Sequence, residues 1–358
     1  MNEDCLKLTA YLSERERAAG GLLADALLDA YERHRVKTSI LLRGIEGYGL
    51  RHHLRSDRML SLSEDLPIVS VAIDTRPRIE ALLDEVAQIR RAGLLTLERA
   101  RMLSDGIEPV SLPEELDEAT KLTAYLGRRD RARGKPAFIA LCDLLRRHGI
   151  AGATALLGVD GTVRGRRQRG RFFSRNAEVP MMVIAVGSGE RISAVLPEIG
   201  ELLHHPLITL ERVRVCKRDG ELLARPHPLP STDEEGMDLW QKLMIYTSES
   251  AAAGKHPIHL ELIRRLRMAG ASGATSLRGV WGFHGEREPH GDRLWQLRRR
   301  APIVSIVVDK PDQIAASFEI VDELAAERGL VTSEMVPAMT TMAEKKRRGE
   351  LRLARHRF

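Results

Sequence analysis

The sequence is poor in aromatic residues, in cysteine and in long apolar runs. Only 4% of its 358 residues are Phe, Trp or Tyr, so any core must be built mainly from aliphatic side chains. The three cysteines, Cys5, Cys142 and Cys216, are too few and too widely spaced for a disulfide framework or a zinc site, which predicts reduced thiols. No run of 18 apolar residues predicts a membrane-spanning helix.

The N-terminal residues also lack the features of a targeting signal. Residues 1–5 contain neither a basic stretch nor an apolar one, so we expect a cytoplasmic protein. The composition, 43% hydrophobic and 30% charged, is typical of packed globular domains and not of a disordered chain.

What the chain does contain is one pattern in three copies. Each copy opens with a lysine-led segment, reaches a glycine turn about 35 residues later and closes with Thr-x-Glu. The opening segments are 7–12, 121–126 and 242–247, the glycine turns 42–47, 157–161 and 277–282, and the closing segments 96–98, 209–211 and 332–334. The repeating unit is therefore a domain of about 100 residues, and the chain contains three of them.

Within the first copy, the hydrophobic periodicity predicts the order of the elements. Apolar and polar residues alternate over 6–12, which predicts a strand with a Lys-Thr-Tyr face opposite its apolar face. A helix pattern follows over 22–31, and a second helix starts near Pro77 and ends before Gly93. The remaining strands are expected at 36–45, 67–73 and 94–103.

The order strand, helix, strand, strand, helix, strand predicts an α+β fold. We expect a ferredoxin-like antiparallel sheet in each repeat, with both helices on one face. The other face would be bare unless the other two repeats cover it. The predicted division is repeat 1 at 5–104, a linker at 105–118, repeat 2 at 119–216, a Pro-rich linker at 217–237, repeat 3 at 238–339 and a basic, disordered tail at 340–358.

The third glycine turn and its surroundings resemble a known family. Residues 270–283, preceded by 246–249 and followed by 301–304 and 329–334, are similar to the PII-like family called domain of unknown function 190. The resemblance spans each whole repeat. It implies a ferredoxin-like subunit of the PII type, which assembles as a trimer with its sheets facing inward, and three repeats in one chain would form a pseudo-trimer.

The resemblance also implies a mode of action. Relatives of this fold bind small effectors, often adenine nucleotides, in clefts between subunits. Their loop between the second and third strands engages a partner, commonly a membrane transporter or an enzyme. The predicted partners are therefore a small anionic effector and a protein such as an ion transporter, and no cofactor is expected apart from an adenine nucleotide effector.

The repeats depart from the family pattern at several positions. Repeat 1 has the segment 35–40 where the family has Gly-x-x-Gly-Ala-Thr, and repeat 2 has Leu157 where the others have Arg43 and Arg278. The glycine-rich phosphate loop of PII proteins is missing, which removes the exposed amides for ATP binding in the PII manner. We therefore expect three unequal clefts, with ligand binding retained around Arg278.

Two sets of residues are candidate ligand contacts at the Arg-Gly-x-x-Gly turns: Arg43, Gly44, Gly47 and Tyr48 in repeat 1, and Arg278, Gly279, Gly282 and Phe283 in repeat 3. The guanidinium and backbone amides suit an anion, and the rings could stack on a base. The alternative is structural: the glycines permit positive φ where the strand bends, and the rings pack at the base of the loop.

A second candidate site comprises Lys7, Lys121 and Lys242, which recur on the strand face opposite the helices. Three copies around a common axis would suit an anion. The alternative is interface packing, in which Glu98, Glu211 and Glu334 pair with the lysines across the sheet.

The sequence predicts neither a metal site nor catalysis. The histidine pairs 52–53, 204–205 and 256/259 lack further ligands at suitable spacing, and no nucleophile–base pair recurs. The favoured function is a non-enzymatic regulator that acts as a single-chain pseudo-trimer. The alternative is a nucleic-acid-associated protein that uses the arginines of 164–171 and the basic tail, although nucleic acid is the less favoured partner.

Overall fold

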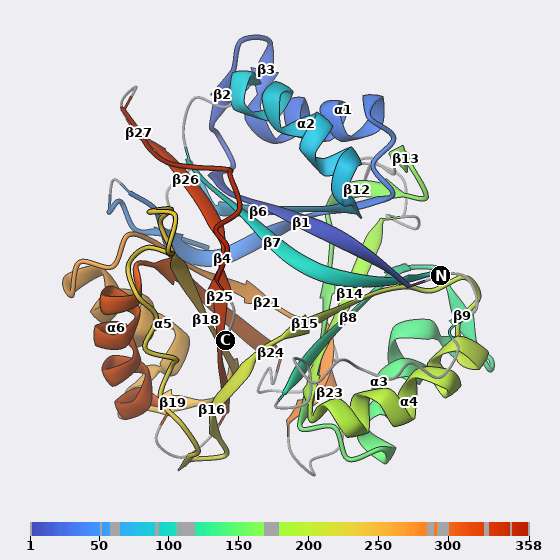
Figure 1. Ribbon diagram of the computed structural model, residues 1–358. Coiled ribbons are helices and arrows are strands. Elements are labelled where there is room, and N and C mark those ends of the chain that lie inside the picture. Colours follow the sequence, from blue (N-terminus) through green and yellow to red (C-terminus); the bar gives the residue numbers. More distant parts are fainter. Residues whose placement is uncertain are drawn as a thin grey trace.

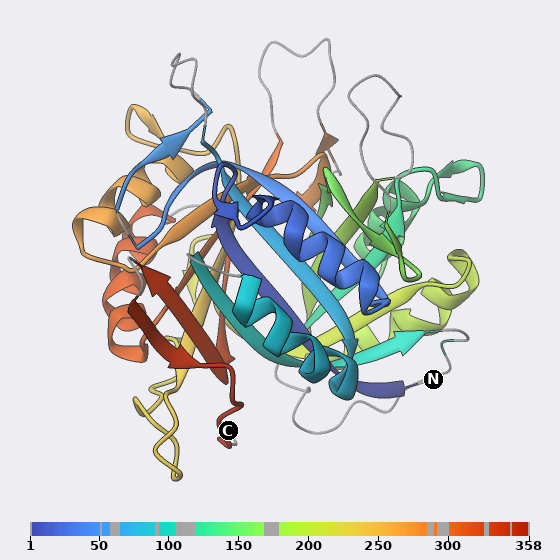
Figure 2. The same cartoon turned by 90° about the horizontal axis from the view of Figure 1, so that it is seen from above.

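The computed structural model describes residues 2–50, 52–57, 65–89, 93–104, 107, 119–167, 179–284, 290–291, 301–325, 329–343 and 346–356. Over these residues the fold is mixed α+β, and the chain forms three similar units around a common centre (Figure 1). The helices lie on the outside and the strands line the interior (Figures 1 and 2). The predicted α+β class with three repeats is confirmed at this level.

The first unit contains β1 (Asn2–Ser13), α1 (Leu23–Arg33), β4 (Thr38–Tyr48), β6 (Pro67–Thr75), α2 (Arg76–Ile89) and β7 (Gly93–Ser104). Its antiparallel strands lie in the order β4, β6, β1, β7. The observed elements follow the predicted order and differ from the predicted bounds by a few residues at their ends. The largest differences are at the start of β1, which begins at Asn2, and at the end of β4, whose last residues pair with β21 of repeat 3.

The other two units repeat this order. The second contains β8 (Thr120–Gly127), α3 (Ala137–Arg147), β11 (Gly152–Leu157), β12 (Asp160–Val163), β14 (Pro180–Gly187), α4 (Gly189–Leu202), β15 (Leu207–Arg212) and β16 (Arg214–Arg218). The third contains β18 (Trp240–Ser248), α5 (Ile258–Met268), β21 (Ala274–Arg278), β22 (Trp281–His284), β24 (Pro302–Asp309), α6 (Pro311–Leu324) and β25 (Leu330–Val336).

Short two-stranded hairpins complete the described elements. One precedes the first helix of each unit, and the sequence patterns did not predict them: β2 (Arg17–Ala18) with β3 (Gly21–Leu22), β9 (Arg131–Ala132) with β10 (Lys135–Pro136), and β19 (Ala252–Ala253) with β20 (His256–Pro257). Four further short strands extend longer ones: β5 (Arg55–Ser56), β13 (Arg166–Arg167), β17 (Glu221–Leu222) and β23 (His290–Gly291).

The polar face of each first strand lies in the shared interior. Leu6 and Leu8 pack with α1 and α2, whereas Lys7 and Thr9 on the opposite face are buried toward the other units. A separate apolar cluster at this centre draws on all three repeats, with members such as Val71, Ile184 and Ile306. The expectation that the other repeats cover the bare face of each sheet is confirmed.

The glycine turns carry each second strand from its own sheet to a neighbouring unit. The first half of β4 pairs with β6, and its second half pairs with β21 of repeat 3. In repeat 2, β11 pairs with β14 and β12 pairs with β4 of repeat 1. In repeat 3, β21 pairs with β24 and β22 pairs with β11 of repeat 2. The three exchanges form a closed cycle.

The glycines are required by close backbone approach. A Cβ at Gly47 would lie 2.5 Å from the carbonyl oxygen of Ala274, and one at Gly282 would lie 2.4 Å from that of Ala153. The prediction that these turns need positive φ is wrong for Gly44, Gly47, Gly279 and Gly282, none of which has positive φ. Any side chain there would push two repeats apart.

The segment that follows each fourth strand forms a second cycle of contacts. The end of β7 pairs with β15 of repeat 2, and β16 pairs with β25 of repeat 3. The third contact is made by β26 (Ala338–Ala343), which pairs with β7 of repeat 1. The predicted disordered tail is therefore wrong over this part of the chain, because β26 and β27 (Lys346–Glu350) form a hairpin that closes the ring.

Other predicted segments have mixed outcomes. The linker at 105–118 lies outside the described residues except for Ile107, and so do residues 58–64, 168–178 and most of 285–300. The second linker contains part of β16 and all of β17, so it contributes to the sheet of repeat 3.

The three cysteines are free, as expected, and all three are buried. Among the described helices, none is long and apolar enough to cross a membrane.

Candidate functional site

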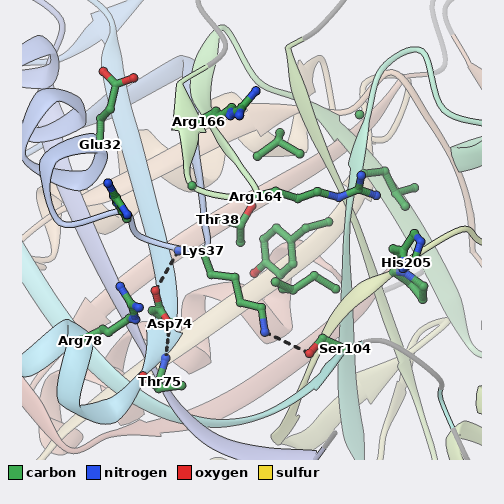
Figure 3. A pocket seen from close by; sticks show the side chains of 18 of the residues that line it. Glu32, Lys37, Thr38, Asp74, Thr75, Arg78, Ser104, Arg164, Arg166 and His205 are labelled. Carbon is green, nitrogen blue, oxygen red and sulfur yellow. Dashed lines mark hydrogen bonds between the residues drawn. The ribbon is translucent and has the colours of Figure 1, made fainter.

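A broad cleft lies between repeats 1 and 2. Its volume is about 1030 Å³, and it opens between the start of β4 on one side and the β12–β13 turn on the other (Figure 3). The floor includes Tyr125, Leu126 and Leu207 of repeat 2 together with Thr38 of repeat 1. Both repeats therefore supply its walls.

The lining of this cleft is predominantly basic. Its five cationic side chains are Arg35, Lys37 and Arg78 of repeat 1, and Arg164 and Arg166 of repeat 2. Three carboxylates, Glu32, Asp74 and Asp130, also line it. Asp74 accepts the backbone N–H groups of Lys37 at 2.8 Å and Thr75 at 2.7 Å (Figure 3). A cleft walled by excess positive charge concentrates small anions.

The backbone at this cleft is strained in three places. Arg35, Arg164 and His205 each have φ of 52°, in the left-handed region that non-glycine residues rarely adopt. In repeats 2 and 3 the position of Arg35, directly after the first helix, is occupied by Gly149 and Gly270, which also have positive φ. Repeat 1 therefore holds an arginine in a conformation that favours glycine, and such strain is typical of functional sites.

The other two repeat interfaces have different linings. An apolar cleft between repeats 1 and 3 has a volume of about 100 Å³ and is lined by residues such as Tyr11, Leu94 and Met342. A second, larger cleft of about 1130 Å³ lies between the same repeats, and its lining includes Glu46, Arg265 and Glu323. At the interface of repeats 2 and 3, His284 lies against Gly152, and its Nε2 is 3.2 Å from the carbonyl oxygen of Thr247. The three interfaces are thus unequal, and the open basic cleft is not the one at Arg278.

The predicted arginines lie in ion pairs. Arg43 donates to Glu14 at 2.9 Å, and Arg278 donates to the equivalent Glu249 at 2.8 Å and lies 3.6 Å from Asp57. Repeat 2 has Leu157 at the arginine position and Arg128 at the glutamate position, so both partners change together. The ion pair with glutamate explains structurally why the arginine recurs in repeats 1 and 3. A ligand contact by Arg43 or Arg278 stays a prediction.

The predicted aromatic residues lie inside neighbouring cores. Phe283 is fully buried in the apolar cluster of repeat 2, and Tyr48 is buried in that of repeat 3, where it stacks on His52 with ring centroids 5.6 Å apart. Thr162, at the equivalent position of repeat 2, bonds to Ser39 of repeat 1 at 3.0 Å. Base stacking by Phe283 is therefore wrong, because its ring is covered on all sides.

The third predicted group lies at the centre of the molecule. Each lysine contacts the glutamate opposite it in its own sheet and a second glutamate from another repeat. The own-sheet contacts are Lys7–Glu98 at 3.0 Å, Lys121–Glu211 at 3.2 Å and Lys242–Glu334 at 3.0 Å, and the cross-repeat contacts are Lys7–Glu211, Lys121–Glu334 and Lys242–Glu98. We call these six residues the Lys–Glu ring, and its cross-sheet pairing is the structural alternative that the sequence indicated.

The ring is buried, and its charges perturb one another. Burial alone would raise the pKa of Glu98, but Lys242 and Lys7 hold it well below its usual range. The same balance, with Lys121 and Lys242 as the nearest cations, lowers the pKa of Glu334. Burial opposes the charge of Lys7, yet the three glutamates raise its pKa. All six residues are at most 7% exposed, so each charge depends on its neighbours.

The ring does not suit a metal ion. One carboxylate oxygen from each of Glu98, Glu211 and Glu334 lies within 4.8 Å of the others, which resembles a ligand set. However, three ammonium groups alternate with these oxygens, and a cation at the centre would meet them at similar range. The ring is already electrically balanced, so an anion has no net charge to attract it.

The basic cleft contains residues that the sequence motifs do not single out as a ligand site. Arg35 and Lys37 belong to the segment interpreted as a loss of the family glycines, and His205 belongs to the position of the missing phosphate loop. The available signal was Arg35 itself, since a long cationic residue stands where two other copies have glycine. Arg164 and Arg166 were noted only as part of a basic loop.

Over the described residues, the fold and its interfaces define a three-repeat α+β protein with a shared interior and an open basic cleft between repeats 1 and 2. A family model described as DUF190 ("Uncharacterized ACR, COG1993") matches residues 5–102, 119–215 and 240–338. The chain belongs to this family, with three tandem copies of its domain. A "UPF0166 protein" of Aquifex aeolicus (strain VF5) is 31% identical over 94 residues, which is 26% of this chain and 88% of that protein.

Comparison with solved structures adds no functional argument. An aspartate kinase from Synechocystis covers 96% of this chain and 46% of its own, at 12% identity and a TM-score of 0.23. An anthrone oxidase-like protein covers 68% of this chain, at 12% identity and a TM-score of 0.17. Both scores are too low to relate the architectures.

Proposed function

We propose that this chain is a non-enzymatic regulatory protein of the PII-like type, in which one chain supplies all three ferredoxin-like units of a pseudo-trimer. Its effector is a small molecule with two or more negative charges, bound in the cleft between repeats 1 and 2. The supporting observation is the convergence of cationic side chains from both repeats on that cleft. Arginine and lysine are the side chains that pair best with phosphate and carboxylate.

A bound anion would connect two repeats. Arg35 is on the repeat 1 side and Arg164 is on the repeat 2 side, so a ligand that reaches both adds contacts across their interface. The regulatory output would be a partner protein, such as an ion transporter, engaged through the loops between the second and third strands. Most of those loop residues lie outside the described part of the chain, and the partner rests on the family resemblance alone.

The nucleic-acid alternative draws no support from the fold. Part of the basic tail on which it relied, β27, is paired with β26. Arg167 of the basic loop contacts Asp25, Asp29 and Asp160, which ties it to repeat 1. Steep loss of binding to DNA or RNA as salt rises would be its signature.

The test is a thermal-shift and calorimetric screen of the full chain with ATP, AMP, cyclic nucleotides, pyrophosphate, bicarbonate and fluoride. A ligand at 100 times its Kd should stabilise the fold by about 2.7 kcal/mol. The variant Arg35→Gln/Arg164→Gln should bind at least tenfold more weakly, because a charge-assisted hydrogen bond contributes about 1.5–3 kcal/mol. Phosphate release during incubation with ATP would contradict the non-enzymatic assignment.

A matched control removes the same charge elsewhere. Arg131 and Arg218 are both exposed and line neither this cleft nor the two between repeats 1 and 3. The variant Arg131→Gln/Arg218→Gln should bind as the parent does. Equal weakening in both double variants would indicate a general charge effect, and no response to any compound would refute the effector site.

A further inference from the structure

A small cavity lies against the Lys–Glu ring at the centre of the molecule. Its volume is about 50 Å³, and all three repeats contribute to its wall. The polar part of the wall consists of Lys7, Lys121, Lys242, Glu211, Thr9, Thr123 and the two tyrosines Tyr11 and Tyr125. The other part is apolar and includes Leu42, Leu156 and Leu277, one from each repeat. Charged groups and aliphatic side chains therefore face the same internal space.

Two carboxylate oxygens of the ring lack a hydrogen-bond partner. They are Glu211 Oε1 and Glu334 Oε1, both buried, and no described residue donates to either. In repeat 1 the equivalent oxygen, Glu98 Oε1, accepts a hydrogen bond from Thr96 Oγ1 at 3.0 Å. An unpartnered buried carboxylate oxygen is costly, so two of the three repeats need a donor that the protein does not supply.

In repeats 1 and 2, the threonine two residues before the ring glutamate lies opposite a threonine of the cavity wall. Thr96 lies opposite Thr9 in the β1–β7 pairing, and Thr9 lines the cavity. Thr209 lies opposite Thr123, which also lines it. Glu211 belongs to the wall itself. The donor that Glu211 Oε1 lacks is therefore needed at the position where the molecule has internal space.

We propose that this cavity is a binding site for ordered water, held by Glu211 Oε1 and the neighbouring threonine hydroxyls. One or two water molecules fit, since each occupies about 30 Å³ in the liquid. Water donates to the carboxylate oxygen and accepts from a lysine N–H. A cation would meet three ammonium groups, an anion would meet Glu211, and an apolar guest would leave the carboxylate unpartnered.

Two tyrosines each line both the central cavity and one of the clefts. Tyr125 lines both the central cavity and the basic cleft between repeats 1 and 2. Tyr11 lines both the cavity and the apolar cleft between repeats 1 and 3.

The direct test is a high-resolution crystal structure of the full chain, with a second crystal under xenon pressure. We expect density for water within hydrogen-bond distance of Glu211 Oε1 and no xenon in the cavity. Xenon in the cavity would show that it is dry and apolar in character, and would overturn the proposal. Density for a larger or ionic guest, or none at all, would overturn it as well.

A substitution provides a second test in solution. Repeat 3 has Met244 in the cavity wall where repeats 1 and 2 have Thr9 and Thr123, so Thr123→Met introduces a side chain already present there. If water fills the cavity, the methionine displaces it, and Tm falls by more than it does for the volume-matched Thr123→Val. If the cavity is dry, Thr123→Met fills a void and Tm rises. If Thr123→Met does not fold, the crystal structures of the parent chain still show whether the cavity holds water or xenon.

Discussion

The ammonium group of Lys242 donates a hydrogen bond to the carboxylate of Glu98, although the two residues lie 144 positions apart, in repeats 3 and 1. Lys242 also contacts Glu334, its cross-sheet neighbour, at 3.0 Å. One cation therefore joins two repeats, and Lys7 and Lys121 repeat the arrangement. The Lys–Glu ring thus links the sheets of all three repeats at their shared centre.

Removing one cation from the ring should be strongly destabilising. Lys242→Met leaves Glu98 with Lys7 and Glu334 with Lys121 as the lysine partner in a buried setting, and we expect a loss of about 3–5 kcal/mol in the free energy of unfolding. Urea denaturation measures this loss. Lys255→Met, at an exposed position, is the matched control and should change stability by less than about 0.5 kcal/mol.

A compensating substitution should restore part of that stability. In Lys242→Met/Glu98→Gln the ring loses one charge of each sign, so its balance returns. The double variant should be more stable than Lys242→Met alone. The single variants Lys242→Met and Glu98→Gln are measured as well. If the stability lost in the double variant equals the sum of the losses in the two single variants, the residues do not interact as the structure shows.

Stability should fall in acid because of the ring. The pKa values of Glu98 and Glu334 are lower in the folded protein than in the unfolded chain, where glutamate titrates near about 4.3. The two carboxylates therefore contribute fully to the stability of the fold above that pH. This contribution is lost as the pH falls through their lower pKa values in the folded protein. Unfolding free energies measured by urea from pH 7 to pH 3 should decline below about pH 5. A smaller decline is expected for Lys242→Met/Glu98→Gln.

The glycine turns should not tolerate a side chain. Gly282→Ala places a Cβ 2.4 Å from the Ala153 carbonyl of repeat 2, and we expect a loss of about 1–3 kcal/mol. Gly20→Ala is the control, since no atom lies within 4 Å of its Cβ position. Thermal unfolding of both variants measures the difference, and Tm should be lower for Gly282→Ala than for Gly20→Ala. Equal Tm values would refute the close-approach explanation.

The C-terminal hairpin should keep the protein from self-associating. A chain that ends at Pro337 lacks β26, which exposes the edge of β7 and removes the buried Ala338 and Met339. Open strand edges pair with other chains, so we expect oligomers in size-exclusion chromatography. A chain that ends at Ala343 retains β26 and should remain a monomer. A monomeric chain 1–337 would contradict the closing role of β26.

The sequence predicted what depends on local pattern. Alternation over 6–12 gave the buried strand and its inward Lys-Thr-Tyr face, and the recurring lysines and glutamates gave the cross-sheet pairs. It did not predict that Phe283 enters the core of repeat 2, because a buried ring in a neighbouring unit has the same local pattern as one in its own loop.

The basic cleft was missed for a related reason. Arg35 and Arg164 stand far apart in the sequence and meet only because β12 pairs with β4 across the interface. Residues 35–40 depart from the family's Gly-x-x-Gly-Ala-Thr pattern, and this departure indicated that repeat 1 had lost a ligand-binding segment. The retained positive φ at Arg35 is a property of the folded chain alone.

The central claim, that a single chain closes the ring of three repeats, is tested most directly by the mass of the full chain in solution. Light scattering coupled to size-exclusion chromatography should give about 40.0 kDa, the mass of one chain. A mass about three times larger, with each chain supplying one repeat to a ring, would contradict the account.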